Sequence, residues 1–221
     1  MIYRHFVLDL DGTLIDSRQD LADAANAMLA TYDASPLPVP DVVAMVGEGA
    51  RTLVARALTR AGVAADPDQA LPRFLDAYDT RLTATTTLYA GVAPTLARLH
   101  RQARVSVLTN KPQAPTDTIL SVLGMAAFVD SAIGGDTPHG RKPSPGALRA
   151  LIAGSGVPAH ETLMVGDSWV DVATATAAGV DACLAAYGFG YAGVDASHRA
   201  QARWTIERVD GLLLFLLDEH L

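Results

Sequence analysis

The sequence predicts an α/β protein, a Rossmann-like parallel sheet core with an α-helical cap domain inserted after the first strand. Two observations carry this prediction. After residue 91, short apolar segments alternate with helical segments, which is typical of a parallel sheet covered by helices. Between residues 17 and 83, helical patterns follow one another without a strand-like segment among them. The 221 residues are enough for such a core with a smaller insert.

The first strand is expected over residues 5–10, an apolar run that leads into an Asp-Gly turn. The inserted helices are expected over residues 17–31, 41–46, 50–61 and 68–83. The alternating part predicts strands over residues 105–109, 132–134, 162–165 and 181–185, with helices over residues 93–101, 116–123, 146–153 and 170–178. These elements divide the chain into a core of residues 1–15 and 86–221 and a helical cap of residues 16–85.

The composition argues against several classes of protein. The formal net charge is −7 and the 17 Lys and Arg residues are scattered, which argues against nucleic acid as a partner. The longest apolar block, residues 212–217, is too short to cross a bilayer, and the first residues lack a signal-peptide pattern. The single cysteine, Cys183, lies in an apolar run and is expected in the core. We therefore expect a cytoplasmic monomer or homodimer that acts on a small molecule, with no nucleic acid or membrane partner.

Polar residues gather where three predicted strands end, and ligands of open parallel sheets bind at this carboxyl edge. The strand ends read Asp9-Leu-Asp11-Gly-Thr13, Thr109-Asn110-Lys111 and Gly166-Asp167-Ser168, with Asp171 in the first turn of the next helix. A separate loop carries Lys142 before a proline, which favours an extended backbone at the lysine. The sequence thus predicts one site built from carboxylate, hydroxyl, amide and ammonium groups.

The first of these motifs indicates phosphate chemistry. Asp9 and Asp11 alternate on an extended backbone, so one carboxylate can face a phosphorus atom while the other reaches the leaving-group oxygen. Gly12 allows backbone amides to approach a phosphate. The alternative is a simple turn, since Asp and Gly are common turn residues. The matching motifs downstream favour the functional interpretation.

The acidic residues predict a metal ion. Four carboxylates are expected at this edge, those of Asp9, Asp11, Asp167 and Asp171. Each close pair would repel by about 4 kcal/mol at 4 Å and an effective dielectric constant of 20. A divalent cation removes this repulsion, and oxygen ligands with retained waters suit Mg²⁺. A structural role is compatible with this interpretation, because Asp167 or Ser168 can cap the following helix and Asp171 is a favourable first-turn charge.

The remaining strand-end groups are expected to hold the phosphate. Thr109 and Asn110 offer neutral donors, and Lys142 is the expected cation for the phosphoryl charge. Lys111 is a competing candidate for that cation. Taken alone, Thr109 could be an ordinary strand residue, residues 110–112 a turn, and Lys142 a solvated surface charge.

Together these motifs resemble those of haloacid dehalogenase superfamily phosphohydrolases, in order and over residues 9–179. Asp11-Gly-Thr-Leu-Ile-Asp-Ser17 and Val46-Gly-Glu-Gly-Ala50 are moreover similar to segments of phosphoglycolate phosphatases, although Tyr89-Ala90-Gly91-Val92 departs from the usual Tyr-Pro-Gly-Val. The resemblance implies a magnesium-dependent phosphatase acting on a small phosphorylated metabolite, in first place 2-phosphoglycolate.

The resemblance also implies roles for the acidic residues. Asp9 would attack phosphorus and form an aspartyl-phosphate, while Asp11 would protonate the leaving alcohol and then take a proton from water. Mg²⁺ would lie between the Asp9 carboxylate, the Asp11 backbone carbonyl and Asp167, with Asp171 farther from the ion.

The predicted recognition segment of the cap consists of Gly47, Glu48, Gly49 and Arg51. Its glycines allow the backbone to approach a ligand, and Arg51 falls at the start of a helix, where a cation is mildly unfavourable without an anionic partner. That partner would be Glu48 or a carboxylate on the substrate. The alternative is that Arg51 is a solvated helix residue.

Other functions stay open at this point. A sugar-phosphate phosphatase or phosphomutase of the same superfamily would keep the same core residues. A haloacid dehalogenase would use Asp9 against carbon, and Asp11 would then be superfluous. A non-enzymatic phospho-acceptor domain also combines a parallel sheet with acidic residues, Thr and Lys, but it normally lacks a helical insert.

Overall fold

The computed structural model describes residues 3–216, so residues 1–2 and 217–221 of the predicted core, including the end of its apolar block, lie outside the described range. The core is a six-stranded sheet in which every neighbouring pair is parallel, with the order β5-β4-β1-β6-β7-β8. The strands are β1 (His5–Leu8), β4 (Arg104–Leu108), β5 (Ser131–Ile133), β6 (Thr162–Gly166), β7 (Asp181–Ala185) and β8 (Trp204–Ile206). The first strand in the sequence therefore lies inside the sheet, between β4 and β6.

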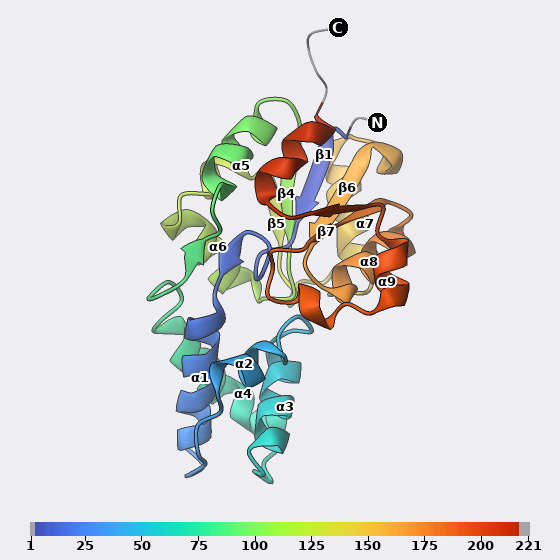
Figure 1. The fold of residues 1–221 in the computed structure, drawn as a ribbon. Coiled ribbons are helices and arrows are strands. Elements are labelled where there is room, and N and C mark those ends of the chain that lie inside the picture. The colour runs from blue at the N-terminus through green and yellow to red at the C-terminus, as the bar shows by residue number, and fades with distance from the viewer. Residues whose placement is uncertain (1–2, 217–221) are drawn as a thin grey trace, which may run out of the picture.

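Helices cover both faces of this sheet (Figure 1). Phe6 and Leu8 pack in one cluster with residues of α5 (Val92–His100) and α6 (Gln113–Val122). Val7, which points to the other face, packs with residues of α7 (Gly146–Ser155) and α8 (Trp169–Ala178). Because both faces are covered, β1 reads in the sequence as a continuous apolar run rather than an alternating one.

Four helices form the insert, α1 (Arg18–Ala30), α2 (Val39–Val43), α3 (Ala50–Arg60) and α4 (Pro67–Asp79). They share a hydrophobic cluster of their own and lie together at one end of the sheet (Figure 1). Two short antiparallel strands, β2 (Ile15–Asp16) and β3 (Thr87–Leu88), lead into and out of the insert. The predicted boundary between residues 15 and 16 falls within β2, and the one between residues 85 and 86 lies just before β3. This division stays a prediction.

A buried carboxylate ties the first helix of the insert to the linker that returns to the core. Asp20, in the first turn of α1, accepts hydrogen bonds from the backbone N–H and the hydroxyl groups of both Thr85 and Thr86 on the returning linker. These donors outweigh the effect of burial and hold the pKa of Asp20 below its usual value.

The predicted fold class is confirmed, and so is the burial of Cys183 in β7. The sequence-based elements omitted β2, β3, β8, α9 (Ala196–Gln201) and the 3-10 helices η1 (Ala126–Phe128), η2 (Ala159–Glu161), η3 (Tyr191–Gly193) and η4 (Val209–Phe215). Strands of two or three residues are too short to display a period in the sequence. Within the described range, no helix combines the length and the apolar character that a membrane span requires.

Candidate active site

Sheet register brings the predicted motifs together. β1 pairs with β4 on one side and with β6 on the other, with Leu8 opposite both Val107 and Val165. Asp9 follows the end of β1, Thr109 follows β4, and Asp167 follows β6. The three strand ends are therefore neighbours at one edge of the sheet, on the side that faces the cap (Figure 1).

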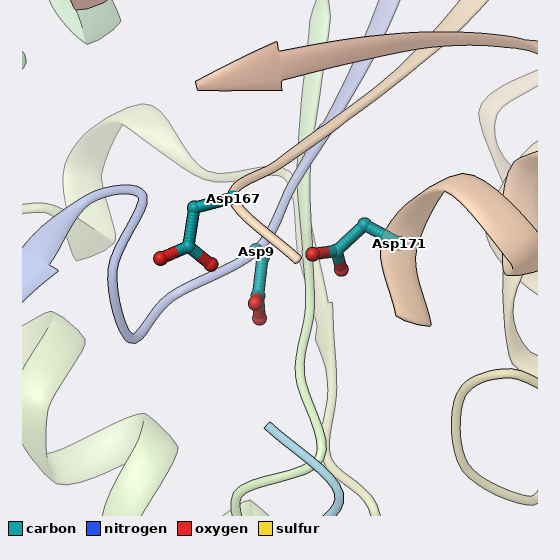
Figure 2. Close-up of side chains that lie close together, drawn as sticks. All are labelled: Asp9, Asp167 and Asp171. Atoms are coloured by element: carbon teal, nitrogen blue, oxygen red, sulfur yellow. The ribbon is translucent and has the colours of Figure 1, made fainter. Parts of the chain in front are cut away.

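Three carboxylates converge at this edge. Asp9, Asp167 and Asp171 each offer an oxygen, and these atoms lie within 4.8 Å of one another (Figure 2). Burial raises the pKa of Asp167 well above its usual value, and the neighbouring carboxylates of Asp171 and Asp9 add to this shift. Burial likewise raises the pKa of Asp9, against the opposing effect of Lys142. Three carboxylate anions this close repel one another, so a nearby positive charge is needed to stabilise the cluster.

Part of that positive charge comes from Lys142. Its buried ammonium lies 2.8 Å from Asp9 Oδ1 and 2.6 Å from Asp171 Oδ1. Asp171 also accepts hydrogen bonds at Oδ2 from the backbone N–H and the hydroxyl of Ser168, so Ser168 is the N-cap of α8 and Asp171 lies in its first turn, as the structural interpretation expected. Burial lowers the pKa of Lys142, but Asp171 and Asp9 raise it by more, so the ammonium stays charged.

The residues present fit a hard divalent cation. Three buried carboxylates face one ammonium, which leaves an excess of negative charge, and every offered ligand atom is an oxygen. Asp167 is oriented by the backbone N–H of Gly190, which donates to Oδ2 at 2.7 Å. Because Lys142 and Ser168 already hold Asp171, Asp9 and Asp167 are the better placed ligands for Mg²⁺.

The close approach of two loops at Asp167 requires glycine. Gly12 has φ +85°, and a Cβ built on it would lie 1.9 Å from Asp167 Oδ2. A Cβ on Gly188 would lie 2.2 Å from the Gly12 carbonyl oxygen and 2.3 Å from Asp167 Cβ. Any side chain at these positions would displace the carboxylate.

Asp11 lies in a different environment from the carboxylate cluster. Ser17 donates its hydroxyl hydrogen to Asp11 Oδ1, and the ammonium of Lys111 lies 3.2 Å from Asp11 Oδ2. Lys111 also donates to the phenol oxygen of Tyr78, on cap helix α4, at 2.6 Å. The two lysines that competed as candidates are thus both in the site, one beside Asp9 and the other beside Asp11.

The second motif lies where predicted, with one correction. Thr109 Oγ1 accepts the backbone N–H of Lys111 at 3.2 Å, which leaves the threonine hydroxyl hydrogen to donate. Asn110 was expected to donate its side-chain amide to phosphate. That amide instead donates to the carbonyl oxygens of Gly47 at 2.9 Å and Lys142 at 3.0 Å. Both hydrogens of the Asn110 amide are therefore used in hydrogen bonds to backbone carbonyl groups. The sequence alone does not show that folding brings these two carbonyl groups next to Asn110.

A small cavity of about 60 Å³ lies between core and cap. The core lines it with Asp9, Asp11, Thr109, Asn110, Lys111, Asp167 and Ser168. The cap contributes mostly apolar side chains, those of Leu21, Val46, Leu53, Phe74 and Leu75, together with Tyr78. The cavity therefore has a mainly charged and polar side formed by the core and a mainly apolar side formed by the cap.

The predicted recognition segment is divided by the fold. Gly47 and Gly49 line the cavity. Glu48 pairs with Arg56 on the next helix, and Arg51 pairs bidentately with Asp68 at 2.6 and 2.9 Å on the exposed side of the cap. Arg51 was expected to pair with Glu48 or with a substrate carboxylate, and this prediction is wrong, because its partner is Asp68. The packing of α3 against α4 brings Asp68 close to Arg51, although the two residues are 17 positions apart in the sequence.

Sequence reasoning missed the contributions of Tyr78, Ser17 and Gly190. The lysine content of the sequence also indicates the site. The chain has 15 arginines but just two lysines, Lys111 and Lys142, and both are buried here. A residue type that is confined to two strand-edge loops in an arginine-rich chain indicates a specific use.

Comparisons with known proteins agree with this geometry. The family model of the haloacid dehalogenase-like hydrolases matches residues 3–179. A protein of Rhodospirillum rubrum named phosphoglycolate phosphatase is 45% identical over 191 residues, which cover 83% of this chain and 79% of that protein. A protein of the same name from Cereibacter sphaeroides is 38% identical, covering 85% of this chain and 87% of its own length.

A solved structure from Haemophilus somnus, described as a predicted phosphoglycolate phosphatase, has the same fold. It superposes with a TM-score of 0.89 at 27% identity and covers 96% of this chain and 97% of its own. The motif order, the site at the carboxyl edge and these relatives lead to one assignment. The chain belongs to the haloacid dehalogenase-like hydrolase family, as an enzyme that hydrolyses phosphoric monoesters.

Proposed function

We propose that the protein is a magnesium-dependent phosphatase that hydrolyses 2-phosphoglycolate through an aspartyl-phosphate on Asp9. The observation that carries this proposal is the placement of Asp9 and Asp11 in one small cavity with different neighbours. Asp9 lies among the buried carboxylates and Lys142, whereas Asp11 lies between Ser17 and Lys111. Two carboxylates in unlike surroundings are suited to two different roles.

In the first step, an Asp9 carboxylate oxygen bonds to phosphorus while the bond from phosphorus to the ester oxygen breaks. Asp11 gives its proton to the departing oxygen, so that the alcohol leaves neutral. In the second step, water attacks the phosphorus of the aspartyl-phosphate and Asp11 takes its proton back. Inorganic phosphate is released and the Asp9 carboxylate is restored.

Lys142 and Thr109 would balance and orient the phosphoryl oxygens during both steps. Lys142 already touches Asp9, so a phosphoryl group on that carboxylate would lie beside the ammonium. Mg²⁺, held by Asp9 and Asp167, would neutralise phosphoryl charge that would otherwise repel the nucleophile. The apolar cap residues over the cavity would limit the access of bulk water during both steps.

The form of the cavity supports a compact substrate. Its cap side presents mainly apolar side chains, which offer few partners for the hydroxyl groups of a sugar. This disfavours the alternatives of a sugar-phosphate phosphatase and a phosphomutase. The presence of Asp11 within the cavity disfavours a dehalogenase, which needs no acid for a halide leaving group. The relatives named phosphoglycolate phosphatase support the same choice of substrate.

The test is a panel of phosphorylated metabolites, including 2-phosphoglycolate and hexose phosphates, assayed for release of inorganic phosphate with and without Mg²⁺. We expect the highest kcat/KM for 2-phosphoglycolate, loss of activity on chelation, and recovery with Mg²⁺. An inactive Asp9→Asn variant should still show a higher Tm in Mg²⁺, because Asp167 and the other ligand oxygens remain. A higher kcat/KM for a hexose phosphate, or undiminished activity after chelation, would contradict the proposal.

A further inference from the structure

The site holds a second buried cation, Lys111, which has no role in the proposed steps of phosphoryl transfer. Of the two lysines in the chain, Lys142 lies with Asp9 and Asp171, on the side of the site where phosphorus would be attacked. Lys111 is also buried, with a side chain that is 4% exposed. Burial of an ammonium is unfavourable unless it is paired. Its carboxylate partner, Asp11, also accepts a hydrogen bond from Ser17.

The surroundings of Lys111 form a site rather than a simple ion pair. Its Nζ lies 3.2 Å from Asp11 Oδ2, 2.6 Å from the Tyr78 phenol oxygen and 4.4 Å from the centre of the Tyr78 ring. Lys111 also lines the cavity, and among the described residues around that cavity it is the one with a cationic side chain. The phenol oxygen accepts from the lysine, so its own hydrogen can be donated elsewhere.

Lys111 lies on the side of the site where the alcohol part of the substrate would bind. Asp11 acts on the ester oxygen, and the carbon skeleton of the alcohol continues from that oxygen. In the phosphate ester of a 2-hydroxy acid, a single carbon separates this oxygen from the carboxylate. A cation in contact with Asp11 is therefore within reach of such a carboxylate, whereas Lys142 is committed to Asp9 and Asp171.

We propose that Lys111 and Tyr78 together bind the carboxylate of the leaving group and thereby make the enzyme selective for phosphate esters of small 2-hydroxy acids. Lys111 supplies the charge and Tyr78 supplies an O–H donor. This inference rests on the proposed function and names the residues that set its substrate class. Because Tyr78 belongs to cap helix α4 and Lys111 to the core, the carboxylate site exists when cap and core are together.

The recognition would be selective for a physical reason. A substrate with the carboxylate gives the buried ammonium a second anionic partner beside Asp11, in a cavity whose cap side is mostly apolar, and a substrate without it offers no such pairing. Sites that hold a buried charge for a ligand reject analogues that cannot pair with it. The sequence predicted that a cap residue, Arg51, would bind Glu48 or the substrate carboxylate. In the structure Arg51 pairs with Asp68 instead, and a buried cation that lines the cavity, Lys111, comes from the core.

The experiment compares two substrates, 2-phosphoglycolate and 2-hydroxyethyl phosphate, in which a hydroxymethyl group replaces the carboxylate. The measured quantity is the preference, the ratio of their kcat/KM values. We expect Lys111→Met to lower the preference roughly 30- to 1,000-fold, the range for loss of a buried charge partner. Tyr78→Phe keeps the Lys111–Asp11 pair and should lower it roughly 10-fold. Arg60→Met is the matched control, because Arg60 pairs with Asp41 on the exposed side of the cap.

A second readout does not depend on turnover. Glycolate and inorganic phosphate are compared as inhibitors, and Lys111→Met should weaken inhibition by glycolate while inhibition by phosphate changes little. Equal losses on both substrates would overturn the inference and make Lys111 a positioning residue for Asp11. An unchanged preference in both variants would overturn it as well.

The outcomes separate this inference from the proposed function. If the wild-type enzyme prefers 2-phosphoglycolate and Lys111→Met keeps that preference, the carboxylate site is wrong and the proposed function stands. If the wild-type enzyme cleaves both esters equally well, the proposed substrate is wrong, and the carboxylate site is overturned with it.

Discussion

The two walls of the cavity are built in different ways. The core wall consists mainly of charged and polar groups that follow strand ends, such as Asp9 and Asp167, with Pro112 and Phe189 as apolar exceptions. The pairing of β1 with its neighbours fixes the spacing of the strand ends. The cap wall consists mainly of apolar side chains on helix faces, such as Leu53 and Phe74, with Tyr78 as a polar exception. Chemistry common to all substrates thus belongs to the core, and discrimination arises where the cap meets Lys111.

The sharpest test of this difference is the nucleophile. Asp9→Asn should lower kcat by about 10⁴-fold or more on 2-phosphoglycolate and on a generic aryl phosphate alike, because an amide cannot form the aspartyl-phosphate. Steady-state kinetics measure the loss, and an unchanged circular dichroism spectrum shows that the fold is intact. Near-normal turnover on either substrate would refute the assignment of Asp9.

Asp11→Asn should have the next largest effect, about 10²- to 10⁴-fold on kcat, since an amide cannot transfer the proton. The carboxylate of Asp11 lies with Ser17 and Lys111 rather than in the cluster around Asp9. Stabilisation of the variant by Mg²⁺, measured as a rise in Tm, should therefore equal that of the wild type. A marked loss of the Mg²⁺ effect would show that the Asp11 side chain binds the ion.

Alanine substitutions at one glycine of the core and one of the cap test the difference between the two sides of the site. Gly12→Ala should abolish stabilisation by Mg²⁺ and most activity, because the new methyl group would fall on Asp167. Gly47→Ala meets no atom within 4 Å of its Cβ, although its φ of +117° makes alanine unfavourable by roughly 1–3 kcal/mol. Titration with Mg²⁺ and denaturant unfolding distinguish the two. Equal Mg²⁺ responses in both variants would contradict the close packing at Asp167.

The core and the cap should also differ in how pH affects their stability, at buried groups outside the cavity. His5, buried in β1, has a pKa lowered to about 4, chiefly by burial, with Asp130 opposing the shift and Arg104 adding to it. The unfolded chain then binds the proton first, so the contribution of His5 is present above pH 6.5 and is lost as the pH falls toward 4. Asp20, which ties α1 to the returning linker of the cap, has a lowered pKa, and its contribution is lost as the pH falls below the ordinary aspartate range.

Unfolding by urea between pH 4 and 7 measures this effect. The difference in free energy of unfolding between wild type and His5→Gln should decrease toward pH 4, by up to about 3 kcal/mol. A matched Asp20→Asn variant should show its change at lower pH. A difference between wild type and His5→Gln that does not vary with pH would refute the account.

The smallest effect is expected for Arg51→Ala. Arg51 pairs with Asp68 on the exposed side of the cap and does not line the cavity. We expect less than a two-fold change in kcat/KM for 2-phosphoglycolate and for an aryl phosphate. A large loss confined to 2-phosphoglycolate would return the carboxylate site to Arg51 and away from Lys111.

The core was predictable from the sequence because strand-end chemistry is local. The apolar run before Asp9 and the alternation after residue 91 place the carboxylates without knowledge of distant contacts. The site groups that escaped prediction depend on contacts far along the chain. The amide of Asn110 meets Gly47, 63 residues away, and Lys111 meets Tyr78, 33 residues away. No local pattern encodes which carbonyl or phenol a folded loop will meet.

The confinement of lysine to the site has a consequence for chemical labelling. Every lysine amine of the chain is buried, so reagents that modify amines, such as formaldehyde with a borohydride, meet an exterior whose basic side chains are arginine and histidine. Lys111 lies against the ring of Tyr78, so its methylation requires the cap to move away. The rate of methylation at Lys111, read by mass spectrometry, would report how often the cap opens.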